Sequence, residues 1–185
     1  MSFFGKTPDQ PFPPRLVICK DALISMPLLE FTNKGIYCPR GDFYIDAWLP
    51  VPRVVITHAH SDHARAGSGS YLCHRLTRPL LELRLGPHPY QSLEWGEAVF
   101  LNGVRVSLHP AGHIIGSSQV RVEYEGEVWV VSGDYKTEDD GLSGAFEALK
   151  CHVFITESTF GLPIYNWKIG LFPIPRRVAH STTRW

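Results

Sequence analysis

Three histidines and one aspartate lie within six residues of the chain, in the order His58, His60, Asp62 and His63. Imidazole nitrogens and carboxylate oxygens are common protein ligands for Zn²⁺ and related divalent ions. On extended backbone, side chains two residues apart point the same way, so His58 and His60 can share one ion. Asp62 and His63 are offset from that pair and can face a second ion. The spacing therefore predicts a metal site rather than a histidine-rich polar loop.

The elements that must position this cluster can be read from the flanking residues. The apolar run 53–56 directly precedes it, and such a run bounded by turn-forming residues is typical of a buried strand. The cluster is therefore expected where a strand ends and the chain turns. Functional residues are often mounted on such loops because the scaffold beneath them is rigid.

Two later segments end in further ligand-type residues. His113 lies on a glycine-rich turn after the strand-like run 104–108, and Asp134 ends the apolar run 128–134. His109 is a weaker competitor for the role of His113, because the proline after it holds it extended at a strand end. Taken singly, a histidine or aspartate in such a place is typical of a solvated turn. Their order behind the histidine cluster is what favours a role as ligands.

In this order the motifs resemble those of the metallo-β-lactamase superfamily. The resemblance implies six residues around two ions: His58, His60 and His113 for the first, Asp62 and His63 for the second, and Asp134 between them. It implies that Asp46, which ends the run 43–46, orients a ligand from outside. It also implies two Zn²⁺ ions, with Mn²⁺ as an alternative. The implied fold is of the α/β (α+β) class, a four-layer αββα sandwich of which this chain supplies the N-terminal half.

A further motif narrows the resemblance. The strand-like run 153–161 contains Glu157 followed by small polar residues, and it resembles the first motif of the β-CASP branch. Members of that branch are nucleases that act on DNA or RNA, and Glu157 would help to position the site. The segments 35–46, 110–113 and 133–136 are together similar to bacterial exonuclease-like proteins associated with DNA ligases and the DNA damage response.

The chemistry follows from the ligands. Two divalent ions a few ångströms apart can lower the pKa of a water between them and neutralise charge on a phosphate under in-line attack. The residues implied to act in catalysis are Asp46, Asp62, Asp134 and Glu157, and no nucleophilic serine or cysteine constellation is apparent. We therefore expect a metal-dependent phosphodiester hydrolase of the DNA exonuclease type. Its expected partner is nucleic acid, DNA ahead of RNA, and its expected context is DNA repair in functional association with a DNA ligase.

Two alternatives stay open. The first is an RNA-processing nuclease or another hydrolase of the same fold, because the motifs specify metal-assisted hydrolysis more firmly than they specify a substrate. The second is a non-catalytic module that binds nucleic acid through a metal-stabilised fold.

The resemblance divides the chain into three regions. Residues 1–27 are expected to be a poorly ordered extension, 28–167 a partial metallo-β-lactamase domain, and 168–185 a tail outside the family. The family pattern implies further histidines after Glu157, one of which completes the second metal position, whereas here the one later histidine is His180. We favour out-of-frame sequence over a basic nucleic-acid-binding arm for the tail. Weak or no activity is expected of the chain as it stands.

Composition sets wider limits. With 18 basic and 18 acidic residues the formal net charge is zero, which argues against a protein that coats DNA nonspecifically. Some arginines near the cluster could still face phosphates: Arg40, Arg65, Arg75, Arg78 and Arg84. Four scattered cysteines without a CxxC pair indicate reduced thiols. Neither a secretory signal nor a membrane-spanning run is apparent, and a cytoplasmic protein is expected.

Short strands are expected at 35–38, 42–45, 53–57, 70–72, 98–101, 104–108 and 152–156. A hairpin is expected to join 119–124 to 127–132 through Glu125 and Gly126, since glycine supplies the positive φ that such turns need. Helices are expected at 63–67, 78–85 and 143–149.

Overall fold

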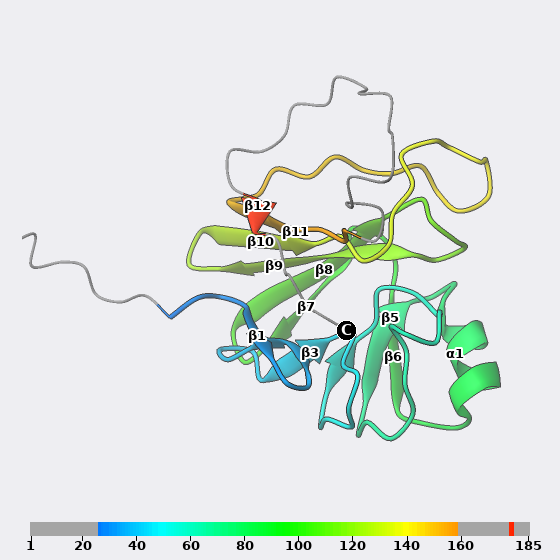
Figure 1. The fold of residues 1–185 in the computed structure, drawn as a ribbon, viewed down its shortest axis with the longest axis horizontal. Helices are drawn as coiled ribbons and strands as arrows, with labels where there is room; N and C mark the ends of the chain where they lie inside the picture. The colour runs from blue at the N-terminus through cyan, green and yellow to red at the C-terminus, as the bar shows by residue number, and fades with distance from the viewer. Residues whose placement is uncertain (1–25, 159–177, 180–185) are drawn as a thin grey trace, which may run out of the picture.

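The computed structural model of the chain describes residues 26–158 and 178–179, which form two sheets and one helix (Figure 1). The first sheet consists, in spatial order, of β1 (Glu30–Thr32), β2 (Gly35–Cys38), β3 (Phe43–Ile45), β4 (Val54–Val55), β5 (Tyr71–His74) and β6 (Tyr90–Leu93). The second consists, in spatial order, of β12 (Val178–Ala179), β11 (Val153–Ile155), β10 (Glu127–Val131), β9 (Ser118–Tyr124), β8 (Val104–Pro110) and β7 (Ala98–Leu101). Helix α1 (Arg78–Leu85) lies between β5 and β6 in the chain.

Alternation along the strands of the first sheet creates two apolar layers. Val55 and Leu72 join a cluster that also contains Val106 and Val120 of the second sheet, so this cluster is the core between the sheets. The neighbouring residues on the opposite face, such as Val54 and Tyr71, pack with Leu81 of α1. Successive residues of a strand point to opposite faces, and this sheet is covered on both. The α+β architecture with face-to-face sheets therefore agrees with the expected fold class.

The directions of the strands decide where the strand ends meet. In the first sheet β3, β4, β5 and β6 are parallel. In the second sheet β8 and β10 are both antiparallel to β9, and β11 is parallel to β10, so β8, β10 and β11 run the same way. The carboxyl ends of these strands consequently gather along one edge of each sheet.

The sequence predicts most of these elements correctly, including α1 at its observed bounds and the hairpin between β9 and β10. Both turn residues of that hairpin have positive φ, 48° at Glu125 and 83° at Gly126. The sequence does not predict strands β1, β6 and β12. Most of the expected tail, most of the expected N-terminal extension, Cys19 and His180 lie outside the described residues, while residues 178–179 of the tail form β12 beside β11.

Two predicted helices are wrong. In place of a helix at 63–67, a single turn closes where the backbone N–H of Ala64 donates to His60, and Gly67 then adopts a φ of +99°. In place of a helix at 143–149, the chain continues without regular structure past Gly144, whose φ is +82°. This second segment is attached to the end of β8, because Glu147 donates its N–H to the Pro110 carbonyl. Tertiary hydrogen bonds and left-handed glycines here override local helix propensity.

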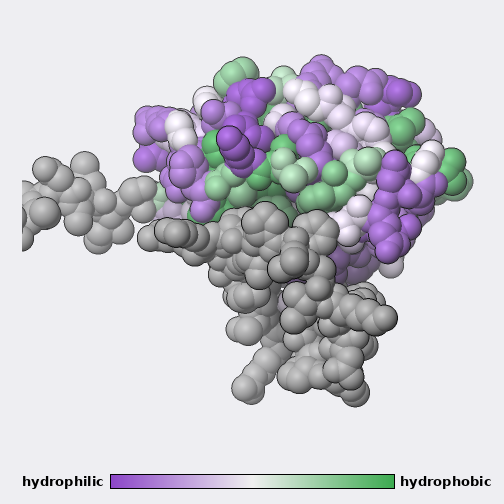
Figure 2. Space-filling model, turned by 90° about the horizontal axis from the view of Figure 1, so that it is seen from above, coloured by the Kyte–Doolittle hydropathy of each residue, from purple (hydrophilic) through white to green (hydrophobic). Residues whose placement is uncertain are grey.

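Within the described residues, no helix is both long and apolar enough to cross a membrane. The described cysteines Cys38, Cys73 and Cys151 are free thiols, as predicted, and the first two are buried. Seen from the side of the second sheet, hydrophobic residues gather in a band between hydrophilic groups (Figure 2).

Candidate metal centre

Five strands deliver ligand-type residues to the shared edge of the sandwich. Asp46 follows β3 and the cluster at 58–63 follows β4 in the first sheet. His113 follows β8, Asp134 follows β10 and Glu157 follows β11 in the second. Because the carboxyl ends of these strands lie together, residues up to 111 positions apart in the sequence, Asp46 and Glu157, come to one place.

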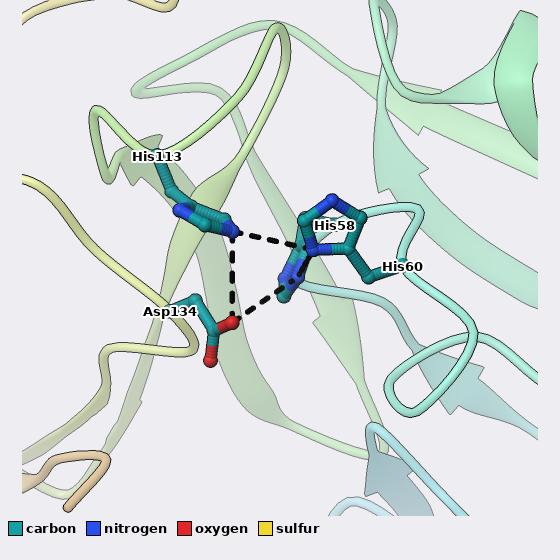
Figure 3. A group of neighbouring side chains, drawn as sticks. All are labelled: His58, His60, His113 and Asp134. Atoms are coloured by element: carbon teal, nitrogen blue, oxygen red, sulfur yellow. Dashed lines mark hydrogen bonds and ion pairs between the residues drawn. The ribbon is translucent and has the colours of Figure 1, made fainter. Parts of the chain in front are cut away.

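Four donor atoms converge at this edge, from His58, His60, His113 and Asp134 (Figure 3). His60 Nδ1 lies 3.0 Å from His58 Nε2 and 3.2 Å from His113 Nε2. Asp134 Oδ2 lies 3.7 Å from His58 Nε2 and 3.6 Å from His113 Nε2. All four atoms lie within 4.8 Å of one another.

These distances fit a single tetrahedral metal ion. With metal–ligand bonds of about 2.0–2.1 Å, neighbouring ligand atoms of a tetrahedral zinc site are about 3.3 Å apart. The observed separations of 3.0, 3.2, 3.6 and 3.7 Å bracket that value. Imidazole nitrogens this close together, beside a carboxylate oxygen, form a donor set that suits zinc and several other divalent transition metals.

A second group of donors adjoins the first on the side of Asp134. His63 Nε2 lies 3.2 Å from Asp134 Oδ1 and 3.6 Å from Asp62 Oδ2. The two oxygens of Asp134 therefore face the two groups separately, Oδ2 the first and Oδ1 the second. In this arrangement each oxygen of Asp134 could serve a different ion. The side chain of Asp62 is 66% exposed, so the second group is more open to solvent than the first.

Asp46 lies behind these ligands and makes three hydrogen bonds to the segment that carries them. It accepts from the backbone N–H of Thr57 at 2.8 Å, from the Thr57 hydroxyl at 2.6 Å and from His63 Nδ1 at 2.8 Å. The sequence predicted an orienting role for Asp46, and these contacts are of the kind that role needs.

Thr57 is a site residue that the sequence reasoning missed. Its hydroxyl has one proton, which must go to the carboxylate of Asp46, so it must accept the remaining hydrogen bond from His58 Nδ1, 3.0 Å away. That hydrogen bond places the proton of His58 on Nδ1 and leaves Nε2 with a lone pair facing the donor cluster. The signal available was the position of Thr57 directly before the first histidine.

The backbone around the centre is tightly constrained. Asp46 has a φ of +46°, an unusual conformation for a residue with a side chain. Gly133 has a φ of +57°, and a Cβ there would lie 2.7 Å from the Cβ of Thr57. The loops of His113 and Asp134 are joined by a hydrogen bond from the N–H of Lys136 to the carbonyl of Ala111.

The surroundings shift the pKa values of His58 and His63 in opposite directions. Burial lowers the pKa of His58 to about 4, so this imidazole is neutral at pH 7, as a metal ligand must be. Burial also acts to lower the pKa of His63, but hydrogen bonds to Asp134 and Asp46 outweigh it and raise the pKa to about 10. The hydrogen bond from His63 holds the pKa of Asp134 below its usual value.

Two further residues considered in the sequence analysis, Glu157 and His109, make contacts of their own near the centre. Glu157 accepts a hydrogen bond from the N–H of Tyr135 at 3.3 Å and lines a cleft together with Asp62 and His63. Nδ1 of His109 lies 2.9 Å from the carboxylate of Glu147. His113, and not His109, is the histidine that joins the group of four donors.

The arginines considered for phosphate contacts are engaged mainly within the protein. Arg75 pairs with Glu94, and Arg78 pairs with Glu82. Arg84 donates to the carbonyl of Ala59, and the guanidinium of Arg40 lies 5.4 Å from the ring centre of Tyr124. Arg65 is exposed.

Comparison with known proteins adds a second line of observation. The chain is 34% identical over 136 residues, 72% of its length, to a protein of Opitutus terrae named "Probable DNA ligase". It is 30% identical over 141 residues, 73% of its length, to "Endoribonuclease ysh1" of Aspergillus fumigatus. The chain thus combines similarity to these two relatives with the ordered histidine and aspartate motifs at the edge of a two-sheet sandwich. The chain belongs to the metallo-β-lactamase superfamily, in its β-CASP nuclease branch.

The superfamily relatives are much longer than this chain, whose matches span 13% and 15% of their respective lengths. No protein-family model matches the chain. Among solved structures, a metallo-β-lactamase motif mutant from Cronobacter sakazakii is similar over 59% of this chain and 56% of its own, with a TM-score of 0.42 at 18% identity. Superfamily membership rests on the motifs and the sequence relatives, not on that likeness.

Proposed function

We propose that the chain is a metal-dependent phosphodiester hydrolase that acts on nucleic acid, with zinc as its metal. The observation that carries the proposal is the convergence of three imidazole nitrogens and a carboxylate oxygen at tetrahedral spacing. A second group, Asp62 and His63, lies on the other side of Asp134. Two adjacent cation positions at the shared edge of the sandwich are suited to the hydrolysis of phosphodiesters.

The residues of the centre divide into holding and positioning groups. His58, His60 and His113 would hold the first ion, Asp62 and His63 the second, and Asp134 both. When bound, the two ions supply Lewis-acid stabilisation of a phosphate and a water of lowered pKa. Asp46 holds His63 directly and His58 through Thr57, so that both imidazoles present Nε2. Glu157 would help to position the substrate side of the site.

The two ion positions are unequal. The first has four donors, including the fully buried His58. The second has three donors among the described residues, and one of them, Asp62, is largely exposed. We therefore expect one tightly held ion and one weakly held ion, and slow turnover in this chain. Activity should rise when excess Zn²⁺ or Mn²⁺ fills the second position.

DNA is the favoured substrate, in an exonuclease-like reaction that serves DNA repair in the cytoplasm. The similarity to a protein named as a DNA ligase over 136 residues supports this choice and a functional association with a DNA ligase. RNA is the second candidate, and the 30% identity to an endoribonuclease over 141 residues supports it.

The experiment compares His109, within strand β8, with His113 on the loop that follows it. Purified chain is incubated with end-labelled single-stranded DNA, duplex DNA and RNA, in Zn²⁺ or Mn²⁺, beside His113→Ala and His109→Ala. We expect cleavage by the wild type and His109→Ala, and none by His113→Ala. Stoichiometric zinc without cleavage of any strand would contradict hydrolysis and favour a non-catalytic binding module. Cleavage that His113→Ala retains would contradict the site.

A further inference from the structure

A cleft of about 220 Å³ lies beside the Asp62 and His63 side of the metal centre. Its polar end is formed by Asp46, Asp62, His63 and Glu157. Its apolar walls come from both sheets: Ile36 and Ile45 from the first, Val131 and Ile155 from the second. The cleft shares Asp62 and His63 with the second group of donors, so the cleft and the metal centre adjoin one another.

Two aromatic side chains, Trp48 and Phe31, line this cleft and remain partly open to solvent. Trp48 is 38% exposed and Phe31 is 50% exposed. Neither belongs to the two hydrophobic clusters of buried residues in the described chain, so the folded core does not account for them. Large aromatic rings that are exposed next to a site are typical of ligand-binding surfaces.

The indole of Trp48 is held in one orientation. Its Nε1–H donates to the carbonyl of Asn33 at 2.7 Å, and its backbone N–H donates to the carbonyl of Lys34 at 3.0 Å. Both acceptors lie in the turn between β1 and β2. A ring fixed in this way loses little conformational freedom when a ligand stacks on it.

From this geometry, and resting on the proposed function, we infer that the cleft binds one unstacked nucleobase of the strand whose phosphate lies at the metal centre. The volume is below the about 300–1,000 Å³ of pockets for drug-sized ligands, so it suits a single flat ring system. The carboxylates at its polar end repel a bare phosphate, which therefore stays with the cations while the neutral base enters the apolar part. Stacking on an aromatic face accepts every base, so the site gives affinity without reading sequence.

The test measures strand binding rather than turnover. A fluorescent single-stranded phosphorothioate oligonucleotide is titrated with the zinc-loaded chain, and a strand of the same length that carries only abasic residues is titrated in parallel. We expect Trp48→Ala to lower the affinity for the base-bearing strand about 5- to 150-fold, the range that stacking of one base on an aromatic side chain produces. The abasic strand should bind the wild type and Trp48→Ala equally weakly.

Three further variants sharpen the result. Trp48→Phe keeps a flat ring and should retain most of the affinity, whereas Phe31→Ala should lose part of it. Phe100→Ala removes an aromatic side chain that is 67% exposed on β7, away from this cleft, and should leave the affinity unchanged. Zinc stoichiometry and the thermal unfolding midpoint show whether each variant is folded.

Each alternative outcome overturns the proposal in a recognisable way. If Trp48→Ala binds the base-bearing strand as well as the wild type does, the cleft is not a base site, although cleavage by the wild type would leave the proposed function intact. If Trp48→Ala weakens binding of both strands equally and lowers the unfolding midpoint, the indole packs against protein instead. If the wild type neither binds nor cleaves any strand, the proposed function fails together with the cleft.

Discussion

The two ends of the sandwich differ in size and in chemistry. At the amino ends of the parallel strands, a cleft of about 540 Å³ is lined by side chains such as Arg53, Gln91 and Asn102. At the carboxyl ends the cleft is smaller, about 220 Å³, but it adjoins histidine and carboxylate groups from both sheets. Among the described residues, the side chains that line the larger cleft do not include a group of metal ligands.

This contrast shows that the direction of the strands, rather than the size of a cavity, selects the site. Five strand ends meet at the metal edge, and each can extend one loop toward the same point. Ligands commonly bind at the carboxyl ends of parallel strands for this reason. The hydrogen-bonded Asp46 and Thr57 then fix the ligands, a feature that the opposite end lacks in the described part of the chain.

The largest expected effect separates the two ends by activity. His58→Ala removes a buried ligand and should lower both hydrolysis and zinc affinity by more than the about 10- to 100-fold that follows loss of an outer hydrogen-bonding partner. Arg53→Ala at the opposite end should change neither by more than about twofold, within ordinary surface effects. Initial cleavage rates and zinc competition with a chelator measure both. If both variants lost cleavage rate and zinc affinity equally, the assignment of the site to the carboxyl ends of the strands would be contradicted.

A smaller effect should follow from loss of the carboxylate behind the ligands. Asp46→Asn preserves shape but cannot accept from both Thr57 and His63 as a carboxylate does, so zinc affinity should fall about 10- to 100-fold. Thr57→Val should produce a smaller decrease, because it affects His58 alone. Chelator competition measures the affinities. If Asp46→Asn binds zinc as the wild type does, the positioning role of Asp46 is wrong.

The constrained backbone should appear in stability. Gly133→Ala places a Cβ 2.7 Å from Thr57 at positive φ, and we expect a loss of about 2–4 kcal/mol in the free energy of unfolding. Gly126→Ala in the β9–β10 hairpin also has positive φ but meets nothing within 4 Å, so about 1–2 kcal/mol is expected. Urea unfolding of the metal-free protein measures the difference, and equal losses would show that the contact with Thr57 is unimportant.

The effect of pH on the metal-free protein comes from two histidines of the centre whose pKa values are shifted in opposite directions. The pKa of His63, raised to about 10, contributes stability that is complete below about 6.5 and is lost as pH rises toward 10. The pKa of His58, lowered to about 4, costs stability as pH falls from about 6.5 toward 4. Unfolding free energies across pH should therefore peak near 6.5. His63→Gln should remove the decline on the alkaline side, and a profile unaffected by that change would contradict the ion pair.

Much of this site could be predicted from the sequence because its residues follow strands in a fixed order. His58, His60, His113 and Asp134 each follow an apolar run, and the structure brings their donor atoms together. The role of Thr57 was missed although it directly precedes His58, because that role depends on a hydrogen-bond chain from Asp46 through Thr57 to His58 that forms only in the folded structure. The false helix at 143–149 has a similar cause, since its backbone bonds to the end of β8 rather than to itself. Local patterns predicted the ends of the strands, while tertiary hydrogen bonds decided what lay between them.

The most direct test of the account is X-ray absorption spectroscopy at the zinc edge, on the chain loaded with one equivalent of zinc. We predict a first coordination sphere dominated by imidazole nitrogen with a smaller oxygen contribution, at about 2.0–2.1 Å. The imidazole signal should decrease in His113→Ala and stay unchanged in His109→Ala. A spectrum dominated by water or sulfur, or one that the two variants alter equally, would contradict a metal centre at the joined ends of β4, β8 and β10.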